Sequence, residues 1–193
     1  MPESKLKIEI MPVGSLEANC YIIYEDDSRQ AAIIDPGEEA AAILERVKAL
    51  AISVRFIIHT HGHYDHTGAS EALRRQTKAR LLIHQADLEL VEFTPEGFVR
   101  DGEIIPLGKL EFKVLHTPGH TPGGISLVCE DHVFTGDTLF ANGVGRTDLT
   151  GGNETALWRS IREKLFTLPE TYIIYPGHGP ASTIGREKKT WKS

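Results

Sequence analysis

The sequence has few cysteines, no long apolar run and no concentrated basic segment, and each absence bears on the class of protein. Two cysteines, Cys20 and Cys129, are too few for a disulfide framework. Both lie in apolar runs, so we expect buried free thiols. No apolar stretch approaches the roughly 20 residues that a membrane-spanning helix needs. Residues 1–5 lack the apolar core of a secretion signal, so we expect a cytoplasmic protein with no membrane partner.

Charge and composition narrow the class further. The formal net charge is −6, and the sequence has no Lys/Arg block beyond the short tail at Lys188 and Lys189. Nucleic-acid binders more often show a concentrated basic face, so we expect no nucleic-acid partner. With 193 residues and 40% hydrophobic side chains, the chain has the size and composition of a single folded domain, residues 1–193.

Short β-rich runs alternate with single helices along the chain. We expect strands at 6–12, 19–25, 31–34, 54–58, 80–83, 110–115, 124–129, 132–134 and 171–175. We expect helices at 38–50, 67–77, 85–91, 154–165 and 184–193, and long loops at 93–101 and 138–153. Hairpins and meanders in both halves indicate an α+β fold, with two β-rich halves packed together and helices outside, rather than a doubly wound parallel sheet.

Histidine is the most informative residue type, and its densest cluster directly follows the expected strand at 54–58. The cluster comprises His61, His63, Asp65 and His66. These four positions do not share one face of a helix, so a sharp turn must bring them together. We expect Gly62 to allow that turn through dihedral angles that other residues avoid. Imidazole and carboxylate groups together suit zinc, with iron or manganese as alternatives.

Three further candidates lie at strand ends and are flanked by glycine. They are His120, Asp137 and His178. A lone histidine of this kind is usually structural, but four such segments in one chain indicate a convergent site. The role of Asp35 stays open at this point: it either supports the metal-ligand loop or caps the Asp-Pro-Gly turn. His59 is expected to be a core or strand-end histidine.

The segment 60–66 matches the T-H-x-H-x-D-H signature of the metallo-β-lactamase superfamily, and His120, Asp137 and His178 follow in the expected order. This resemblance implies a four-layer αββα sandwich with two metal ions at one edge. It implies that the first ion is held by His61, His63 and His120, the second by Asp65, His66 and His178, with Asp137 bridging both. True β-lactamases of this fold usually lack this complete arrangement, so we do not expect antibiotic hydrolysis.

Within the superfamily, the segments 136–140 and 145–148 resemble glyoxalase II-like thioesterases, in the short form without a C-terminal helical domain. The resemblance implies cleavage of S-lactoylglutathione or a related hydroxyacyl thioester by a metal-bridging hydroxide that Asp65 and Asp137 orient. It also implies that Arg146 contacts the substrate, and we expect Tyr64 and Phe140 to shape the pocket. Pro180 stands where glyoxalase II has a substrate-binding tyrosine, a departure that bears on affinity for glutathione thioesters.

A persulfide dioxygenase, which has the same fold, remains the alternative to a thioesterase. Persulfide dioxygenases also carry a Gly-Arg-Thr-Asp segment, as this chain does at 145–148. They use one iron, held by residues that match His61, His120 and Asp137. Metal content and oxygen uptake would discriminate this oxidoreductase from the hydrolase.

Overall fold

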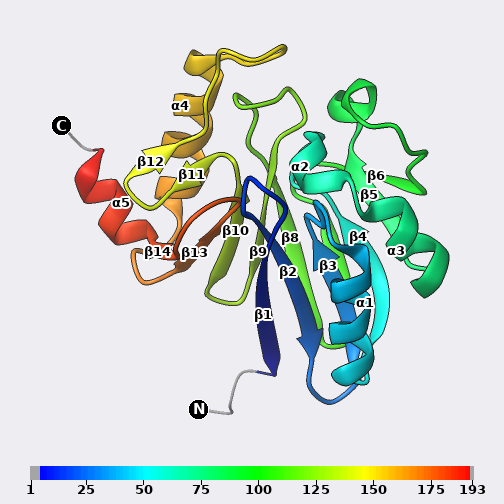
Figure 1. The fold of residues 1–193 in the computed structure, drawn as a ribbon. Coiled ribbons are helices and arrows are strands. Elements are labelled where there is room, and N and C mark those ends of the chain that lie inside the picture. Colours follow the sequence, from blue (N-terminus) through cyan, green and yellow to red (C-terminus); the bar gives the residue numbers. More distant parts are fainter. Residues whose placement is uncertain (1–4, 192–193) are drawn as a thin grey trace.

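The computed structural model describes residues 5–191. Two six-stranded β-sheets pack face to face, and helices cover the outer side of each sheet (Figure 1). The first sheet has the order β1-β2-β3-β4-β5-β6. Its strands are β1 (Leu6–Val13), β2 (Ala18–Glu25), β3 (Gln30–Ile34), β4 (Ser53–Ile58), β5 (Arg80–His84) and β6 (Gly97–Val99). The pairs β1–β2 and β2–β3 are antiparallel, and β3 to β6 run parallel.

Parallel neighbours need crossover connections, and helices supply two of them in this sheet. Helix α1 (Ala40–Ala49) connects β3 to β4, and α2 (Tyr64–Thr67) with α3 (Ser70–Thr77) connects β4 to β5. A 3₁₀ helix, η1 (Gln85–Leu90), follows β5. The consequence for the site is that β3 and β4 end at the same edge of the sheet, where the expected metal-binding turn begins.

The second sheet has the order β14-β13-β10-β9-β8-β7 and is antiparallel except for the pair β10–β13. Its strands are β7 (Ile104–Leu107), β8 (Leu110–His116), β9 (Ile125–Cys129), β10 (His132–Gly136), β13 (Ile173–Pro176) and β14 (Ser182–Thr183). The connection from β10 to β13 contains a small hairpin and two helices. These are β11 (Leu139–Phe140), β12 (Gly143–Val144), α4 (Glu154–Glu163) and η2 (Leu165–Thr167), and α5 (Ile184–Thr190) follows β14.

Three apolar clusters account for the four layers. Alternate side chains of β2 point to opposite faces: Tyr21 and Ile23 join the cluster between the sheets, while Cys20 and Ile22 join the cluster under α1 and α3. The third cluster packs α4, η2 and α5 against the second sheet. Because helices cover the outer faces, central strands such as β2 and β3 are buried on both sides, whereas β7 and β8 alternate buried and exposed residues. The αββα sandwich expected from the sequence is confirmed.

Most expected elements are confirmed, and the differences have local causes. The expected loop at 93–101 contains β6, and that at 138–153 contains β11 and β12; β7 and β14 were not expected. Pairing with neighbouring strands stabilises these short segments, which have little periodicity of their own. The expected helix at 67–77 begins at Ser70, as α3, and the short helix α2, just before it, was not expected. The two are separate because the Ala69 N–H bonds to the Pro36 carbonyl (3.0 Å) instead of continuing α2.

Two expectations concern the cysteines and membrane association. Cys20 and Cys129 are buried free thiols, as expected, and burial raises the pKa of both, that of Cys129 to about 12. Among residues 5–191, no helix is long and apolar enough to span a bilayer. The last two residues of the helix expected at 184–193 lie outside the described residues.

Candidate metal centre

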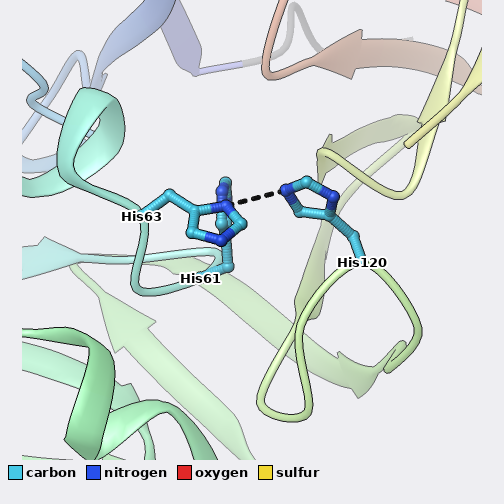
Figure 2. Close-up of side chains that lie close together, drawn as sticks. All are labelled: His61, His63 and His120. Carbon is cyan, nitrogen blue, oxygen red and sulfur yellow. Dashed lines mark hydrogen bonds between the residues drawn. The ribbon is translucent and has the colours of Figure 1, made fainter. Parts of the chain in front are cut away.

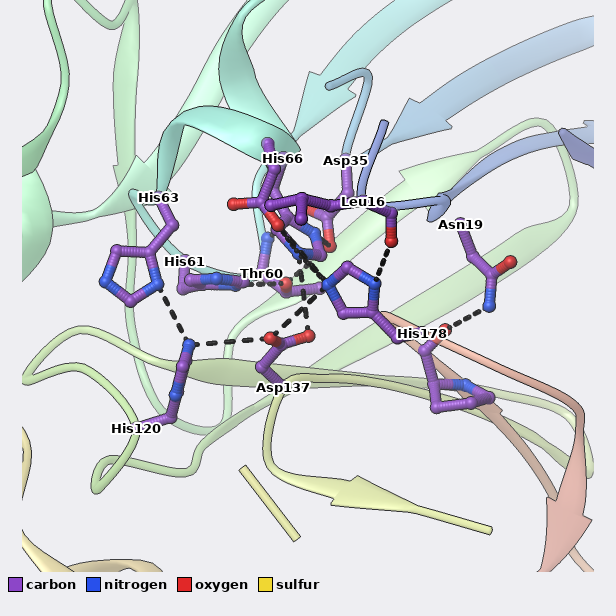
Figure 3. Close-up of polar contacts among 12 residues, drawn as sticks. Leu16, Asn19, Asp35, Thr60, His61, His63, His66, His120, Asp137 and His178 are labelled. Atoms are coloured by element: carbon purple, nitrogen blue, oxygen red, sulfur yellow. Dashed lines mark hydrogen bonds and ion pairs between the residues drawn. The ribbon is translucent and has the colours of Figure 1, made fainter. Parts of the chain in front are cut away.

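All seven side chains predicted as metal ligands converge at one edge of the sandwich. Figure 3 labels all of them except Asp65. They come from four segments that are far apart in the sequence. His61 and His63 follow β4, Asp65 and His66 lie on α2, His120 is in the β8–β9 connection, Asp137 follows β10 and His178 follows β13. The parallel pair β10–β13 ends next to the carboxyl end of β4, which explains why these segments meet.

His61, His63 and His120 form the first group (Figure 2). The Nδ1 atom of His63 lies 2.9 Å from Nε2 of His120. The His61 ring lies 4.9 Å from each of the other two rings, measured between centroids. Three imidazoles whose nitrogens converge in this way match the His₃ donor set of many zinc sites.

Asp65, His66 and His178 form the second group. Oδ2 of Asp65 lies 3.3 Å from Nε2 of His178 and 3.5 Å from Nε2 of His66. The two imidazole Nε2 atoms are 3.2 Å apart. One carboxylate and two imidazoles therefore face a common point beside the first group.

Asp137 lies between the two groups (Figure 3). Its Oδ2 atom is 3.5 Å from Nε2 of His120 and 3.7 Å from Nε2 of His178. Its Oδ1 atom is 3.5 Å from Nε2 of His66 and has no hydrogen-bond partner, although it is buried. This carboxylate is placed to be shared between two cations.

The orientations of the His120 and His178 rings suit cation binding. Nδ1 of His120 lies 2.8 Å from the Arg146 carbonyl, and Nδ1 of His178 lies 3.0 Å from the Leu16 carbonyl. A carbonyl only accepts, so Nδ1 carries the proton in each ring and a neutral ring directs the Nε2 lone pair inward. Nε2 of His61 is buried and unpartnered. Inward lone pairs 2.9 to 3.2 Å apart repel one another unless a proton or a cation lies between them.

Ionisation at the site follows from burial and close charges. Burial and the neighbouring histidines hold the pKa of His61 well below its usual value, so its lone pair is available. Burial would lower the pKa of His66, but Asp137 and Asp35 raise it to about 9. Burial would raise the pKa of Asp65, but the hydrogen bond to His178 and the charges of His66 and His178 lower it to about 2. The Asp65 carboxylate is therefore ionised at neutral pH, as metal binding requires.

Glycine acts in the ligand loops by allowing close packing. Gly62 does not have a positive φ angle, so the expectation about its dihedral angles is wrong. A Cβ atom there would lie 2.7 Å from Cβ of Leu90, so a larger residue would not fit against η1. Similarly, a Cβ atom on Gly177 would lie 2.1 Å from Oδ1 of Asp137. In both places the missing side chain brings two segments together beside the ligands.

The three residues expected to contact substrate line one cavity of about 620 Å³ together with five of the seven predicted ligands. Tyr64 is 71% exposed, and the Phe140 ring lies 6.3 Å from the His178 ring. The Arg146 guanidinium forms two 2.7 Å hydrogen bonds to Asp148. Sequence reasoning missed three apolar members of the lining, which are Leu16, Val144 and Leu149.

Asp35, whose role the sequence left open, supports the ligand loop. Its Oδ1 accepts from the Thr60 N–H (2.7 Å), and its Oδ2 accepts from the Thr60 hydroxyl (2.5 Å) and lies 3.2 Å from Nδ1 of His66. The Thr60 hydroxyl in turn lies 3.1 Å from Nδ1 of His61. His59 is a core residue, as expected, and its ring packs 4.9 Å from Phe93.

Comparison with known proteins gives relatives of the same length and fold. Hydroxyacylglutathione hydrolase GloC of Haemophilus influenzae is 38% identical over 205 residues, which cover 96% of each chain. Among solved structures, the BLEG-1 B3 metallo-β-lactamase has a TM-score of 0.90 at 33% identity and covers 95% of this chain and 97% of its own.

Two further solved structures are similar over nearly all of this chain. ETHE1 from Myxococcus xanthus has a TM-score of 0.86 at 36% identity and covers 95% of this chain and 82% of its own. TTHA1623, solved in a di-iron-bound form, has a TM-score of 0.86 at 31% identity and covers 94% and 98%. The family model of the metallo-β-lactamase superfamily matches residues 13–178. The chain therefore belongs to the metallo-β-lactamase superfamily.

Proposed function

We propose that this metallo-hydrolase is a glyoxalase II-like thioesterase that cleaves S-lactoylglutathione or a related hydroxyacyl thioester. The observation that carries the proposal is the pair of ligand groups that share Asp137 beside a cavity of about 620 Å³. The similarity to GloC along 96% of the chain supports the choice of substrate class.

The seven side chains fit two divalent ions, and zinc suits their nitrogen and oxygen donors, with iron or manganese as alternatives. Ions held there would lower the pKa of a bound water from about 15.7 to near 7 and so supply hydroxide at neutral pH. Asp65, ionised and partly exposed to the cavity, and Asp137 would orient the attacking water by accepting its hydrogen bonds. The leaving group is a thiolate, and the corresponding thiol has a pKa of about 8.5. The thiolate therefore leaves readily, and the chain needs no separate acid to protonate it.

The cavity walls suggest how the substrate is held. Tyr64 and Phe140 add aromatic surface to the cavity that the predicted ligands line. The Arg146 side chain is 62% exposed and its partner Asp148 is 69% exposed, so their ion pair exchanges readily for a substrate carboxylate or carbonyl. Arg146 would thus contribute to affinity rather than to bond breaking.

The test is metal analysis of protein purified without added metal, paired with an assay on S-lactoylglutathione. We expect two divalent ions per chain and metal-dependent hydrolysis, and we expect His61→Ala and Asp137→Ala to lose both. Turnover that survives in a metal-depleted Asp137→Ala sample would refute the scheme. A β-lactam belongs in the same assay because BLEG-1 is named as a B3 metallo-β-lactamase, and we expect no turnover of it.

The alternative, a mono-iron persulfide dioxygenase, is favoured by the positions of its three expected iron ligands. His61, His120 and Asp137, the three residues that would hold its iron, are among the converging side chains, and the Gly-Arg-Thr-Asp segment at 145–148 adjoins the cavity. One iron per chain with oxygen uptake on glutathione persulfide would assign this activity. Two ions per chain with no oxygen uptake would assign the thioesterase.

A further inference from the structure

A fully buried carboxylate, that of Asp87 on η1, binds both loops that carry the first ligand group. Its Oδ2 accepts the N–H of Gly62 (2.9 Å) and the hydroxyl of Thr121 (2.7 Å). Its Oδ1 accepts the N–H of Gly123 (2.5 Å). Three donors therefore meet two carboxylate oxygens in a site that excludes water.

Two of these donors adjoin ligands of the first group in the sequence. Gly62 lies between His61 and His63, and Thr121 directly follows His120. Figure 2 shows that these histidines approach one another from two separate loops, and Asp87 is bonded to each of those loops. Its carboxylate thus sets the separation between the loops.

The second group has different supports. The Asp35 carboxylate lies 3.2 Å from Nδ1 of His66, and the Leu16 carbonyl accepts from Nδ1 of His178 at 3.0 Å. The hydrogen bonds of Asp87 do not reach the residues adjoining these two histidines in the sequence. Asp35 is shared between the groups, because it also holds Thr60, whose hydroxyl lies 3.1 Å from Nδ1 of His61. The hydrogen bonds of Asp87, in contrast, adjoin ligands of the first group.

We propose that Asp87 is a positioning residue that sets the affinity of the His61–His63–His120 group for its metal ion and leaves the affinity of the second group unchanged. This inference rests on the proposed metal centre. It assigns no contact between Asp87 and an ion or substrate, because Asp87 acts through two backbone N–H groups and the Thr121 hydroxyl of the two loops.

Asp87→Asn replaces one carboxylate oxygen by an NH₂ group, which removes the negative charge and turns one acceptor into a donor. In Asp87→Asn, the NH₂ group must face the N–H of either Gly62 or Gly123, and two donors repel. The packing leaves little room to relax, because a Cβ atom on Gly123 would already lie 2.6 Å from Oδ1 of Asp87. Metal–ligand distances tolerate only about 0.2 Å, so a small separation of the loops weakens the site. Losing an outer contact of this kind typically costs about 10–100-fold in metal affinity.

The experiment measures zinc affinity by competition with a chelator in two single-site backgrounds. His178→Ala leaves the first group as the stronger site, and His63→Ala leaves the second. We expect Asp87→Asn to lower the zinc affinity about 10–100-fold in the His178→Ala background. In the His63→Ala background the affinity should stay within about twofold.

Glu187→Gln is the matched control. Glu187 is also fully buried, and it accepts the Asn142 N–H (2.8 Å) and the Ser182 hydroxyl on a part of the fold without predicted ligands. Its substitution should lower thermal stability and leave both zinc affinities unchanged. If Asp87→Asn weakened both backgrounds equally, or neither, the proposal would be overturned.

Thr121→Val keeps the test valid if Asp87→Asn does not fold. It removes one of the three donors and keeps the size of the side chain, and we expect a smaller loss confined to the His178→Ala background. Equal effects of Thr121→Val in both backgrounds, or none, would also overturn the proposal. A wild-type chain that binds fewer than two ions would instead refute the proposed metal centre, so the two failures are distinguishable.

Discussion

Adding one methyl group at Gly177 would displace the carboxylate that joins the two ligand groups. A Cβ atom at this position would lie 2.1 Å from Oδ1 of Asp137, whereas ordinary contact begins at 3.4 Å. Gly177 is held on both sides, because its N–H donates to the Gly136 carbonyl (2.9 Å) and its carbonyl accepts from the Asn19 N–H (2.7 Å). In Gly177→Ala, the Asp137 side chain must therefore move, by about 1.3 Å if it alone relieves the contact.

That displacement exceeds the roughly 0.2 Å that a metal–ligand bond tolerates. A misplacement of about 1 Å in an active site costs on the order of 100-fold in rate. We therefore expect Gly177→Ala to bind fewer than two ions per chain and to lose at least about 100-fold in kcat/KM on the thioester. Overpacking should also cost about 1–3 kcal/mol of unfolding free energy.

Metal analysis, steady-state kinetics and thermal unfolding on the same sample separate these effects. Gly143→Ala is the matched control, because a Cβ atom there makes only ordinary contacts of 3.6 Å with Phe140 and its backbone φ angle is not positive. The control should keep two ions and its activity. A folded Gly177→Ala protein with two ions and undiminished turnover would refute the bridging role of Asp137.

Four further outcomes follow from other contacts in the structure. In the metal-free protein, His66 has a pKa of about 9 and is protonated at neutral pH. Because a metal ion needs the lone pair of this ring, zinc binding should release a proton, which a pH-stat would record. For the same reason zinc affinity should fall as the pH drops below 9. The same raised pKa stabilises the metal-free fold fully below about pH 6.5 and loses this contribution as the pH rises through 9, which urea titrations should detect. Asn153→Ala removes the cap on the Ala156 N–H of α4 (2.9 Å), so calorimetry should show a loss of about 1 kcal/mol with unchanged metal content. Arg146→Ala should raise KM and leave metal content unchanged, because the Arg146 carbonyl, not its side chain, holds His120.

The predicted ligand set could be derived from the sequence because its members are chemically distinctive. His61 to His66 lie in one short segment after an apolar strand, and a glycine precedes each of His120, Asp137 and His178. The structure brings all seven together, and their role as ligands stays a prediction. The layer order could also be predicted, because apolar strands alternate with single amphipathic helices in both halves of the chain.

The contacts that hold the ligands could not be predicted in the same way. The Leu16 and Arg146 carbonyls fix His178 and His120, and a backbone carbonyl has no signature in the sequence. Asp87 lies in a short polar helix, where an acidic side chain usually faces solvent. Only the packing of η1 against both ligand loops buries it and provides its three donors.

Anomalous diffraction from zinc-loaded crystals tests the central claim most directly. We expect two zinc peaks in each chain, one among His61, His63 and His120 and one among Asp65, His66 and His178, with Asp137 in contact with both. A single peak, or zinc bound away from Asp137, would contradict it.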